Sequence, residues 1–376
     1  MTFAHRKTLL AALLAAGFAG SALFAHNGPD SEHLAPPKDA LCVTADVRTG
    51  TGANTYQSVA NWCQIPGGKV DLGSPTHGGV AVDKAGNIYF SMDGGPHGIL
   101  VYAPDGKMVR GIADKYTGIH GLMINEEKGE EFLYGARNGH ADVLKLKLDG
   151  TVVWTIGIPL ESGKYDDPKI PAEKPKAGEK AKPRRAYNPT GIAVAPNMHV
   201  FVVDGYGQNW VHEFDENQKY VKSFGGPGKE DGKFATCHGI ALDTRGEKPL
   251  LLICDRANHR LQHFDLDGNF VAVITKDANH LPCAVSFHGK NVAIAELDGR
   301  VAIIDGANNV VSVLGENPNP KQRGNFGVPP ADWKDGIFNA PHGVSYDKDG
   351  NLYVEDWNKS GRISKMIKVA DQASAQ

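Results

Sequence analysis

The sequence carries almost no excess charge of either sign. Its 40 lysine and arginine residues nearly balance its 43 aspartate and glutamate residues, and the formal net charge is −3. Such a balance gives no indication of a basic surface for nucleic acid or for an anionic membrane. We therefore expect neither as a partner, and we expect a monomer that acts on a small-molecule or peptide substrate.

Long hydrophobic runs are also missing beyond the N-terminus. Within residues 1–25, a basic stretch at 5–7 precedes an apolar run at 9–14 and small residues that end near Ala25. This order is typical of a secretory signal peptide, and the run is too short to span a bilayer. We expect a secreted or periplasmic protein after cleavage near Ala25, the alternative being a hydrophobic N-terminal helix. Residues 26–40 are interpreted as a flexible lead-in.

Cysteine is scarce, with five residues in the whole chain. In an oxidising compartment these allow up to two disulfides and leave at least one thiol. Cys42 and Cys63 flank a segment that must fold back on itself, which makes them the first predicted pair. Cys237 and Cys283 could pair with each other or flank a metal ion, and Cys237 could supply a thiolate ligand. Cys254 completes the set.

What the sequence does contain is a repeat built on one short phrase. A His-Gly-apolar phrase occurs at His120, His238 and His342, and a Gly-apolar or Ala-apolar step follows three further positions, Gly78, Thr190 and Cys283. These six ring positions lie 42, 70, 48, 45 and 59 residues apart. The two long spacings contain insertions near residues 161–187 and 315–338. Without them each unit has about 40–45 residues, the size of a four-stranded propeller blade.

The turns within each unit predict its strands. In the last unit, apolar residues 343–346 and 352–354 flank an Asp-Lys-Asp-Gly-Asn turn, as expected of a hairpin. We predict an all-β fold, a six-bladed β-propeller that occupies residues 41–370 as one domain, with a tail at 371–376. The sixth unit lacks an obvious fourth strand, so we predict that residues near 55–65 supply it and close the ring.

The three ring histidines fall in blades two, four and six. Alternate blades of a six-fold ring lie about 120° apart around its axis. Three imidazoles that converge from such directions form the base of a tetrahedral site with an open fourth position, the arrangement of catalytic zinc. We predict one zinc ion bound by His120, His238 and His342. The alternative is that each His-Gly pair caps its strand and bonds a neighbouring carbonyl.

Loops on the same rim offer candidate substrate contacts. The predicted loops after the second strands carry Tyr206, Arg256, Arg137 and Trp357. Arginines and an aromatic ring beside an open cation site suit a small anionic or carbonyl-bearing substrate. The alternative is that the arginines pair with neighbouring aspartates. Five other histidines are interpreted as surface or loop residues: His77, His97, His140, His259 and His263.

The two insertions are predicted to behave differently. The first is rich in lysine and proline between residues 164 and 185, so we predict an exposed loop, with a basic lid or partner-binding arm as the alternative. The second contains Phe326 and Trp333, which indicates that it packs onto the propeller.

Blades three and four contain runs that are similar to those of a known family. The runs at 188–194, 203–206 and 254–262 resemble NHL-repeat propellers, and within them peptidyl-α-hydroxyglycine α-amidating lyase, the lyase half of peptidylglycine α-amidating monooxygenase. The resemblance covers roughly residues 70–368. It implies zinc on the three ring histidines, a base at Tyr206 and an assisting arginine at Arg256. The family's further arginine in the first blade has no counterpart in residues 91–94.

Three functions follow as hypotheses. The first is an exported zinc-dependent lyase of the amidating-lyase type, or a related lyase or hydrolase of a small substrate. The second is a non-catalytic NHL propeller that binds a peptide, polymer or protein on its metal-bearing face. The third is a calcium-dependent lactonase-like propeller, for which carboxylates and asparagine are expected at the axis.

Overall fold

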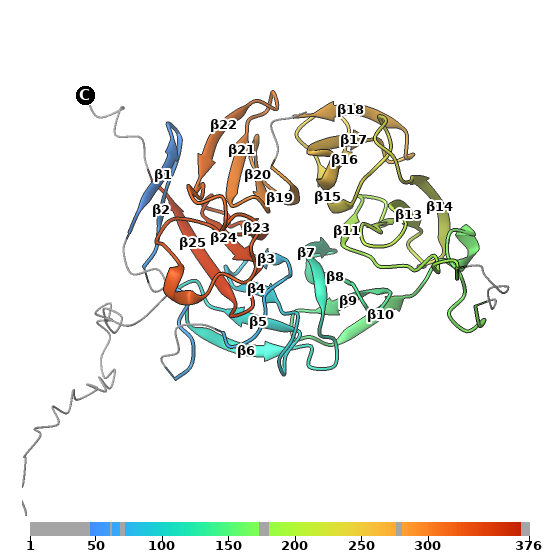
Figure 1. Cartoon of the computed structure of the whole chain (residues 1–376), viewed down its shortest axis with the longest axis horizontal. Helices are drawn as coiled ribbons and strands as arrows, with labels where there is room; N and C mark the ends of the chain where they lie inside the picture. The colour runs from blue at the N-terminus through green and yellow to red at the C-terminus, as the bar shows by residue number, and fades with distance from the viewer. Residues whose placement is uncertain (1–45, 61, 68–71, 173–179, 276–279, 370–376) are drawn as a thin grey trace, which may run out of the picture. The chain divides into compact units, whose positions relative to one another are not determined.

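The computed structural model describes residues 46–60, 62–67, 72–172, 180–275 and 280–369. Their strands form six antiparallel sheets arranged in a ring around one axis, as Figure 1 shows. The predicted all-β, six-bladed propeller is therefore confirmed. The expected signal peptide, lead-in and C-terminal tail lie outside the described residues.

The strands follow one another around the ring in chain order. Blades one and two are built from β3 (Val80–Val82), β4 (Ile88–Ser91), β5 (Ile99–Tyr102), β6 (Met108–Ile112), β7 (Ile119–Glu127), β8 (Glu130–Arg137), β9 (Asp142–Lys147) and β10 (Val152–Ile156). Blades three and four are built from β11 (Gly191–Val194), β12 (Val200–Val203), β13 (Trp210–Phe214), β14 (Tyr220–Gly225), β15 (Cys237–Asp243), β16 (Leu250–Asp255), β17 (Arg260–Phe264) and β18 (Phe270–Ile274).

The last two blades contain the seam of the ring. They are built from β19 (Pro282–His288), β20 (Asn291–Glu296), β21 (Arg300–Ile304), β22 (Val310–Leu314), β23 (Pro341–Tyr346), β24 (Leu352–Asp356) and β25 (Arg362–Lys368), joined by β1 (Arg48–Thr51) and β2 (Asn54–Ser58). The helical segments in the described ranges are three short 3-10 turns, η1 (Leu160–Ser162), η2 (Arg256–Asn258) and η3 (Pro330–Asp332). No helix in these ranges is long and apolar enough to cross a membrane.

The hairpin turns are held by an aspartate that folds back over the turn. Asp347 accepts hydrogen bonds from the backbone N–H and the side-chain amide of Asn351, both at 2.9 Å. Gly350 takes a φ of +81° in this turn, which a side chain would strain. Asp83 and Asn87 repeat the arrangement in blade one at 2.7 Å. These turns return each second strand to the rim where its chain entered.

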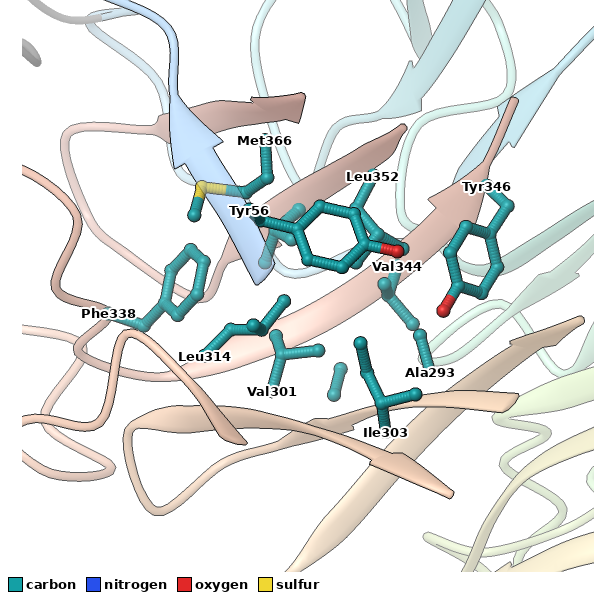
Figure 2. Close-up of a cluster of buried hydrophobic side chains, with 12 residues drawn as sticks. Tyr56, Ala293, Val301, Ile303, Leu314, Phe338, Val344, Tyr346, Leu352 and Met366 are labelled. Atoms are coloured by element: carbon teal, nitrogen blue, oxygen red, sulfur yellow. The ribbon is translucent and has the colours of Figure 1, made fainter. Parts of the chain in front are cut away.

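The N-terminal strand closes the ring as predicted. β2 pairs antiparallel with β25, with Tyr56 opposite Lys368, and β1 adds a fifth strand outside it. Figure 2 shows Tyr56 and Met366 in one buried cluster with Leu314 of the neighbouring blade. Burying a side chain of this size contributes roughly 1.5–3 kcal/mol, so the seam is sealed by packing as well as by hydrogen bonds. The closing strand ends at Ser58, earlier than expected.

The hydrophobic core lies between the blades. Each of six buried clusters draws its residues from two neighbouring sheets, so that every sheet is covered on both faces. The strand β12 is an example, because all four of its residues are buried. Neighbouring first strands contact one another around the axis. This packing places the ring position at the start of each blade against a central cavity.

The insertions are anchored to the propeller. Tyr165 and Tyr187 are buried, and the Tyr165 hydroxyl donates to Asp204 at 2.7 Å. Tyr165 contradicts the prediction of an exposed loop at residues 164–185, whereas residues 168–172 and 180–185 are exposed as predicted and residues 173–179 lie outside the described residues. In the second insertion Phe326 stacks on Trp357 of blade six, and the guanidinium of Arg362 on β25 lies over the ring of Trp333. Its predicted packing onto the propeller is confirmed.

Candidate metal centre

Each ring histidine sits at an irregularity that its following glycine makes possible. The strand register shifts around all three histidines, between Ile119 and Gly121 in the second blade, for example. A Cβ on Gly121 would lie 2.5 Å from the Thr190 carbonyl oxygen of the next blade, and one on Gly239 would lie 2.3 Å from the Cys283 carbonyl oxygen. The His-Gly phrase therefore recurs because the adjacent blade's backbone approaches too closely for any side chain.

The same carbonyl groups orient the imidazoles. His120 Nδ1 lies 2.8 Å from the Thr190 carbonyl oxygen, and His238 Nδ1 lies 2.8 Å from that of Cys283. His342 Nδ1 lies 2.9 Å from the carbonyl oxygen of Gly78. Because a carbonyl can only accept, each Nδ1 carries the hydrogen and each Nε2 keeps its lone pair. The alternative predicted from the sequence, a hydrogen bond from each histidine to a neighbouring carbonyl, is therefore present. The same hydrogen bond sets the tautomer that a metal-binding histidine needs.

The three rings converge on the axis. Their centroids lie 4.6 to 4.7 Å apart, and the Nε2 atoms of His238 and His342 are separated by 3.2 Å. Burial lowers the pKa of all three imidazoles well below the usual value, so they are neutral at neutral pH. Two facing lone pairs repel unless a cation lies between them. Tetrahedral zinc with Zn–N bonds of about 2.0–2.1 Å requires ligand nitrogens about 3.3 Å apart, so the residues fit the ion.

Tyr206 reaches the same point from blade three. Its hydroxyl oxygen lies 3.3 Å from His120 Nε2 and 3.1 Å from His238 Nε2. The loop that carries it is folded around Asp204, which accepts backbone hydrogen bonds from Asn188 and Gln208. Burial raises the pKa of Tyr206, and the nearby guanidinium of Arg256 opposes that rise. The structure thus brings the predicted base beside the predicted ligands.

Arg256 holds the hydroxyl of Tyr206 from blade four. Its Nη1 donates to the Tyr206 hydroxyl oxygen at 3.1 Å, and its guanidinium carbon lies 5.2 Å from the centre of the tyrosine ring. The backbone N–H of Arg256 donates to the Thr236 carbonyl at 3.0 Å, which fixes η2 on the rim. Arg256 can therefore stabilise negative charge on the phenol oxygen.

Arg137 is placed differently from Arg256. Its Nε donates to Asp142 Oδ1 at 2.7 Å, and its guanidinium lies over the ring of Tyr116. Arg137 and Asp142 are opposite each other on β8 and β9. Blades four and six have the same cross-strand pair with the charges exchanged, Asp255 with Arg260 and Asp356 with Arg362. The structure thus shows the alternative arrangement for Arg137, a pair with a rim aspartate, and substrate could contact it only if that pair opened.

His77 is a member of the cluster that the sequence analysis missed. Its ring centroid lies 4.8 Å from that of His120 and 4.5 Å from that of His342. Trp357, predicted as a substrate contact, stacks on His77 at 4.5 Å and on Phe326 at 4.5 Å. The signal was present, because His77 and Gly78 repeat the His-Gly phrase one residue before the aligned position. His263, also interpreted as a surface or loop residue, is buried and bonds Asp243 at 2.9 Å.

The cysteines differ in their distance from the histidine cluster. Cys237 and Cys283 are both free thiols, so of the two alternatives for them the disulfide is not formed. Cys237 donates toward the Trp210 carbonyl at 3.9 Å, whereas the Cys283 sulfur lies within 4.8 Å of nitrogen atoms of His238 and His342. The thiol beside the cluster is therefore Cys283. The proposed pair of Cys42 and Cys63 cannot be assessed, because Cys42 lies outside the described residues.

An axial cavity of about 340 Å³ opens beneath the histidines. It is lined by the first strands of all six blades, from the ring positions to residues such as Leu242 and Phe287 further along those strands. No carboxylate side chain lines it within the described ranges. The centre therefore lies between the cavity and the rim loops that carry Tyr206 and Arg256.

Comparisons with known sequences identify one repeat type. A profile of the NHL repeat matches residues 338–366. NHL repeat-containing protein 3 of Mus musculus is 24% identical over 271 residues, which cover 65% of this chain and 72% of the mouse protein. Protein lin-41 of Caenorhabditis elegans is 40% identical over 52 residues, or 14% of this chain and 4% of that protein. The chain thus contains an NHL repeat.

Solved structures share the fold at low identity. A streptogramin B lyase structure matches with a TM-score of 0.51 and 14% identity, over 85% of this chain and 97% of that chain. A gluconolactonase from Xanthomonas campestris matches with a TM-score of 0.53 and 13% identity, over 89% of this chain and 98% of that chain. These matches show the propeller fold and do not single out the amidating lyase.

Proposed function

We propose that the chain is an exported zinc-dependent lyase of the peptidyl-α-hydroxyglycine amidating-lyase type, or a related lyase or hydrolase of a small substrate. One observation carries this proposal. Three neutral imidazoles present Nε2 lone pairs to one point, and the hydroxyl of Tyr206 lies beside that point with Arg256 bonded to it. Export is proposed from the signal-like pattern of residues 1–25.

The donor set favours zinc over calcium. Imidazole nitrogen is a ligand that zinc prefers, whereas calcium takes six to eight oxygen donors. The cavity below the histidines has no carboxylate lining in the described ranges. A lactonase-like calcium centre would therefore lack its ligands on the axis. His120, His238 and His342 would hold the zinc ion, which when bound supplies Lewis acidity to a substrate oxygen.

Tyr206 is suited to move the proton. A cation held by the histidines lowers the pKa of a phenol this close to it, against the effect of burial. Tyr206 would then accept the proton of a substrate hydroxyl, while Arg256 donates a hydrogen bond to the same phenol oxygen. In an α-hydroxyglycine substrate the hydroxyl oxygen forms the carbonyl of glyoxylate as the carbon–nitrogen bond breaks. Tyr206 returns the proton to the amide nitrogen that leaves.

The fold is compatible with this chemistry. Proteins named as a streptogramin B lyase and as a gluconolactonase have propellers that match most of this chain. Their names indicate bond cleavage in small molecules by propellers of this general shape. They support a small-substrate enzyme as a class, and the residues at the axis support the lyase within it.

The test combines a metal analysis with an activity assay. Purified wild-type protein should contain about one zinc ion per chain and should release glyoxylate from α-hydroxyhippurate. Failure of the zinc-loaded protein to release glyoxylate would reject the amidating-lyase proposal. Binding of a peptide, polymer or protein on the same face would then be the function to test, and the exposed Phe326 beside Trp357 would be its contact point.

A further inference from the structure

We propose that His77 is a fourth imidazole ligand of the cation at the propeller axis. This inference rests on the metal centre of the proposed function, and it changes the number of ligands that the chain supplies. His77 belongs to blade one, which has glycine at its ring position and otherwise contributes no imidazole to the axis. Blades one, two, four and six would then each provide one nitrogen.

The position of the His77 ring matches that of the other three. His77 Nε2 lies 3.4 Å from the Tyr206 hydroxyl oxygen. The same oxygen lies 3.3 Å and 3.1 Å from the Nε2 atoms of His120 and His238. Donor atoms of His77, His120 and His342 all lie within 4.8 Å of one another. Four imidazoles therefore present the same ring nitrogen to one small region.

The surroundings of His77 leave its Nε2 facing the cluster. Its Nδ1 lies 3.7 Å from a carboxylate oxygen of Asp93, a longer contact than those between the other three Nδ1 atoms and their carbonyl oxygens. A carboxylate near this nitrogen favours the tautomer with its hydrogen on Nδ1, which leaves the Nε2 lone pair for a cation. The indole of Trp357 stacks on the imidazole at an interplanar angle of 24° and limits its rotation.

The backbone next to His77 is held by hydrogen bonds from Thr76 to blade six. Thr76 donates its N–H to the Asn358 carbonyl at 3.0 Å and its hydroxyl to the Asp356 carbonyl at 2.6 Å. The His77 side chain is 12% exposed, whereas the other three histidines are about 2% exposed. His77 is thus the outermost ligand of the set. A substrate oxygen would enter as a fifth ligand, which zinc can accommodate.

Cys283 is the competing donor for the fourth position. Its sulfur lies within 4.8 Å of nitrogen atoms of His238 and His342. The thiol donates to the Leu281 carbonyl at 3.5 Å, which turns its hydrogen away from the axis. His77 Nε2 lies 3.4 Å from the Tyr206 hydroxyl, the same group that the Nε2 atoms of His120 and His238 face. The geometry thus favours nitrogen over sulfur.

The experiment loads the full-length mature protein with Cu²⁺ and with Co²⁺. The Cu²⁺ electron paramagnetic resonance spectrum should show splitting from four nitrogens in the wild type and from three in His77→Ala. Zinc affinity, measured against a chromophoric chelator, should fall at least about tenfold in His77→Ala, since even the loss of a group that only orients a ligand costs roughly 10–100-fold. His77→Gln serves in its place if the alanine variant does not fold.

The matched control is His97→Ala. His97 pairs with Asp114 at 2.7 Å through Nδ1, so it forms a His–Asp pair in the same blade but on an exposed edge. Its spectrum and zinc affinity should equal those of the wild type. A three-nitrogen spectrum in the wild type, or one unchanged in His77→Ala, would overturn the inference and leave the three-histidine centre standing. A sulfur-to-cobalt charge-transfer band that disappears in Cys283→Ser would overturn it in favour of sulfur. A wild type that binds no metal would reject the proposed function itself.

Discussion

Blades two, four and six differ from blades one, three and five in what they contribute to the axis. The even blades each place a histidine at the ring position, and the odd blades place Gly78, Thr190 and Cys283 there. Yet every even-blade histidine depends on an odd blade, because the carbonyl that accepts its Nδ1 hydrogen belongs to one of those three residues. The candidate metal centre is therefore built by pairs of neighbouring blades. A single blade provides an imidazole, and the next blade provides the carbonyl that orients it.

The odd blades also add functional side chains near the gaps between the histidines. Tyr206 of blade three lies near His120 and His238, and His77 of blade one lies near His120 and His342. Cys283 of blade five lies near His238 and His342. The even blades thus supply the three ring imidazoles, and the odd blades supply Tyr206, His77 and Cys283 around them.

The largest expected effect, on zinc content, distinguishes a histidine side chain that binds the ion from a residue whose backbone carbonyl only orients a histidine. His238→Ala should lower zinc content well below the wild-type value of about one ion per chain, because it removes one of the three buried imidazoles that converge on the axis. Thr190→Ala should keep its zinc, because the group that orients His120 is the Thr190 backbone carbonyl. Elemental analysis of both variants beside the wild type is the measurement. Equal zinc in wild type and His238→Ala would contradict the proposed centre.

The second effect tests the proposed proton acceptor of blade three, Tyr206, while the ring histidines are left unchanged. Tyr206→Phe should slow glyoxylate release by about 10²–10⁴-fold while zinc content is unchanged, because it removes the proton acceptor. Tyr220→Phe is the control, since Tyr220 bonds Ser223 on an outer strand of the same blade. The measurement is the rate of glyoxylate release by both variants under zinc saturation. A Tyr206→Phe variant as fast as the control would assign the base to another group.

The third prediction concerns pH and the loop that carries Tyr206. Burial raises the pKa of Asp204 from 3.8 to about 6, and its side-chain partners include no basic group of the kind that Arg260 offers Asp255. The folded state binds the proton more tightly than the unfolded state, so this contribution to stability is full below pH 4 and is lost as pH rises through about 6. The loss should be on the order of 2–3 kcal/mol.

Denaturant unfolding between pH 4 and pH 7 measures this effect. The wild type should lose stability relative to Asp204→Asn across that interval, whatever the offset between the two proteins at any single pH. A constant difference between the two free energies of unfolding would show that Asp204 has an ordinary pKa.

The smallest effect compares equivalent glycines. Gly239→Ala in blade four should cost about 1–3 kcal/mol of unfolding free energy, because its Cβ would lie 2.3 Å from a backbone carbonyl. Gly191→Ala in blade three should cost less, because the same contact there is 3.0 Å. Thermal and denaturant melts check the order. A larger loss in Gly191→Ala would mean that the close approach is not specific to the histidine blades.

Most of the fold could be predicted because its signals are local and periodic. The ring positions, the Asp-Gly-Asn hairpins and the missing fourth strand of blade six each lie within a few residues of sequence. Tyr206 and Arg256 were placed near the axis because their loops follow second strands at a fixed point in the repeat. The position of each of these residues is set by its place in the repeat. Its expected role then follows from that position on the rim and from the functional group of its side chain.

The residues that were misplaced depend on contacts that no repeat specifies. Arg137 occupies a rim position equivalent to those of Asp255 and Asp356, yet the cross-strand partner Asp142 engages it. His77 lies one residue outside the alignment and is turned inward by Trp357 of blade six, 280 residues away in sequence. Tyr165 ties an insertion to Asp204 by a buried hydrogen bond. Such pairings form only when distant segments meet.

By itself the sequence determined the number of blades, the closing strand and the three imidazoles on alternate blades, because each follows from a repeat of fixed period and from strand alternation. The tertiary structure alone decided which side chains share the centre: His77 and Cys283 lie in it, whereas Arg137 and Cys237 do not. The reason is physical. A repeat fixes where a backbone runs, but the direction of a side chain is set by the carbonyl, carboxylate or ring that it meets on another blade.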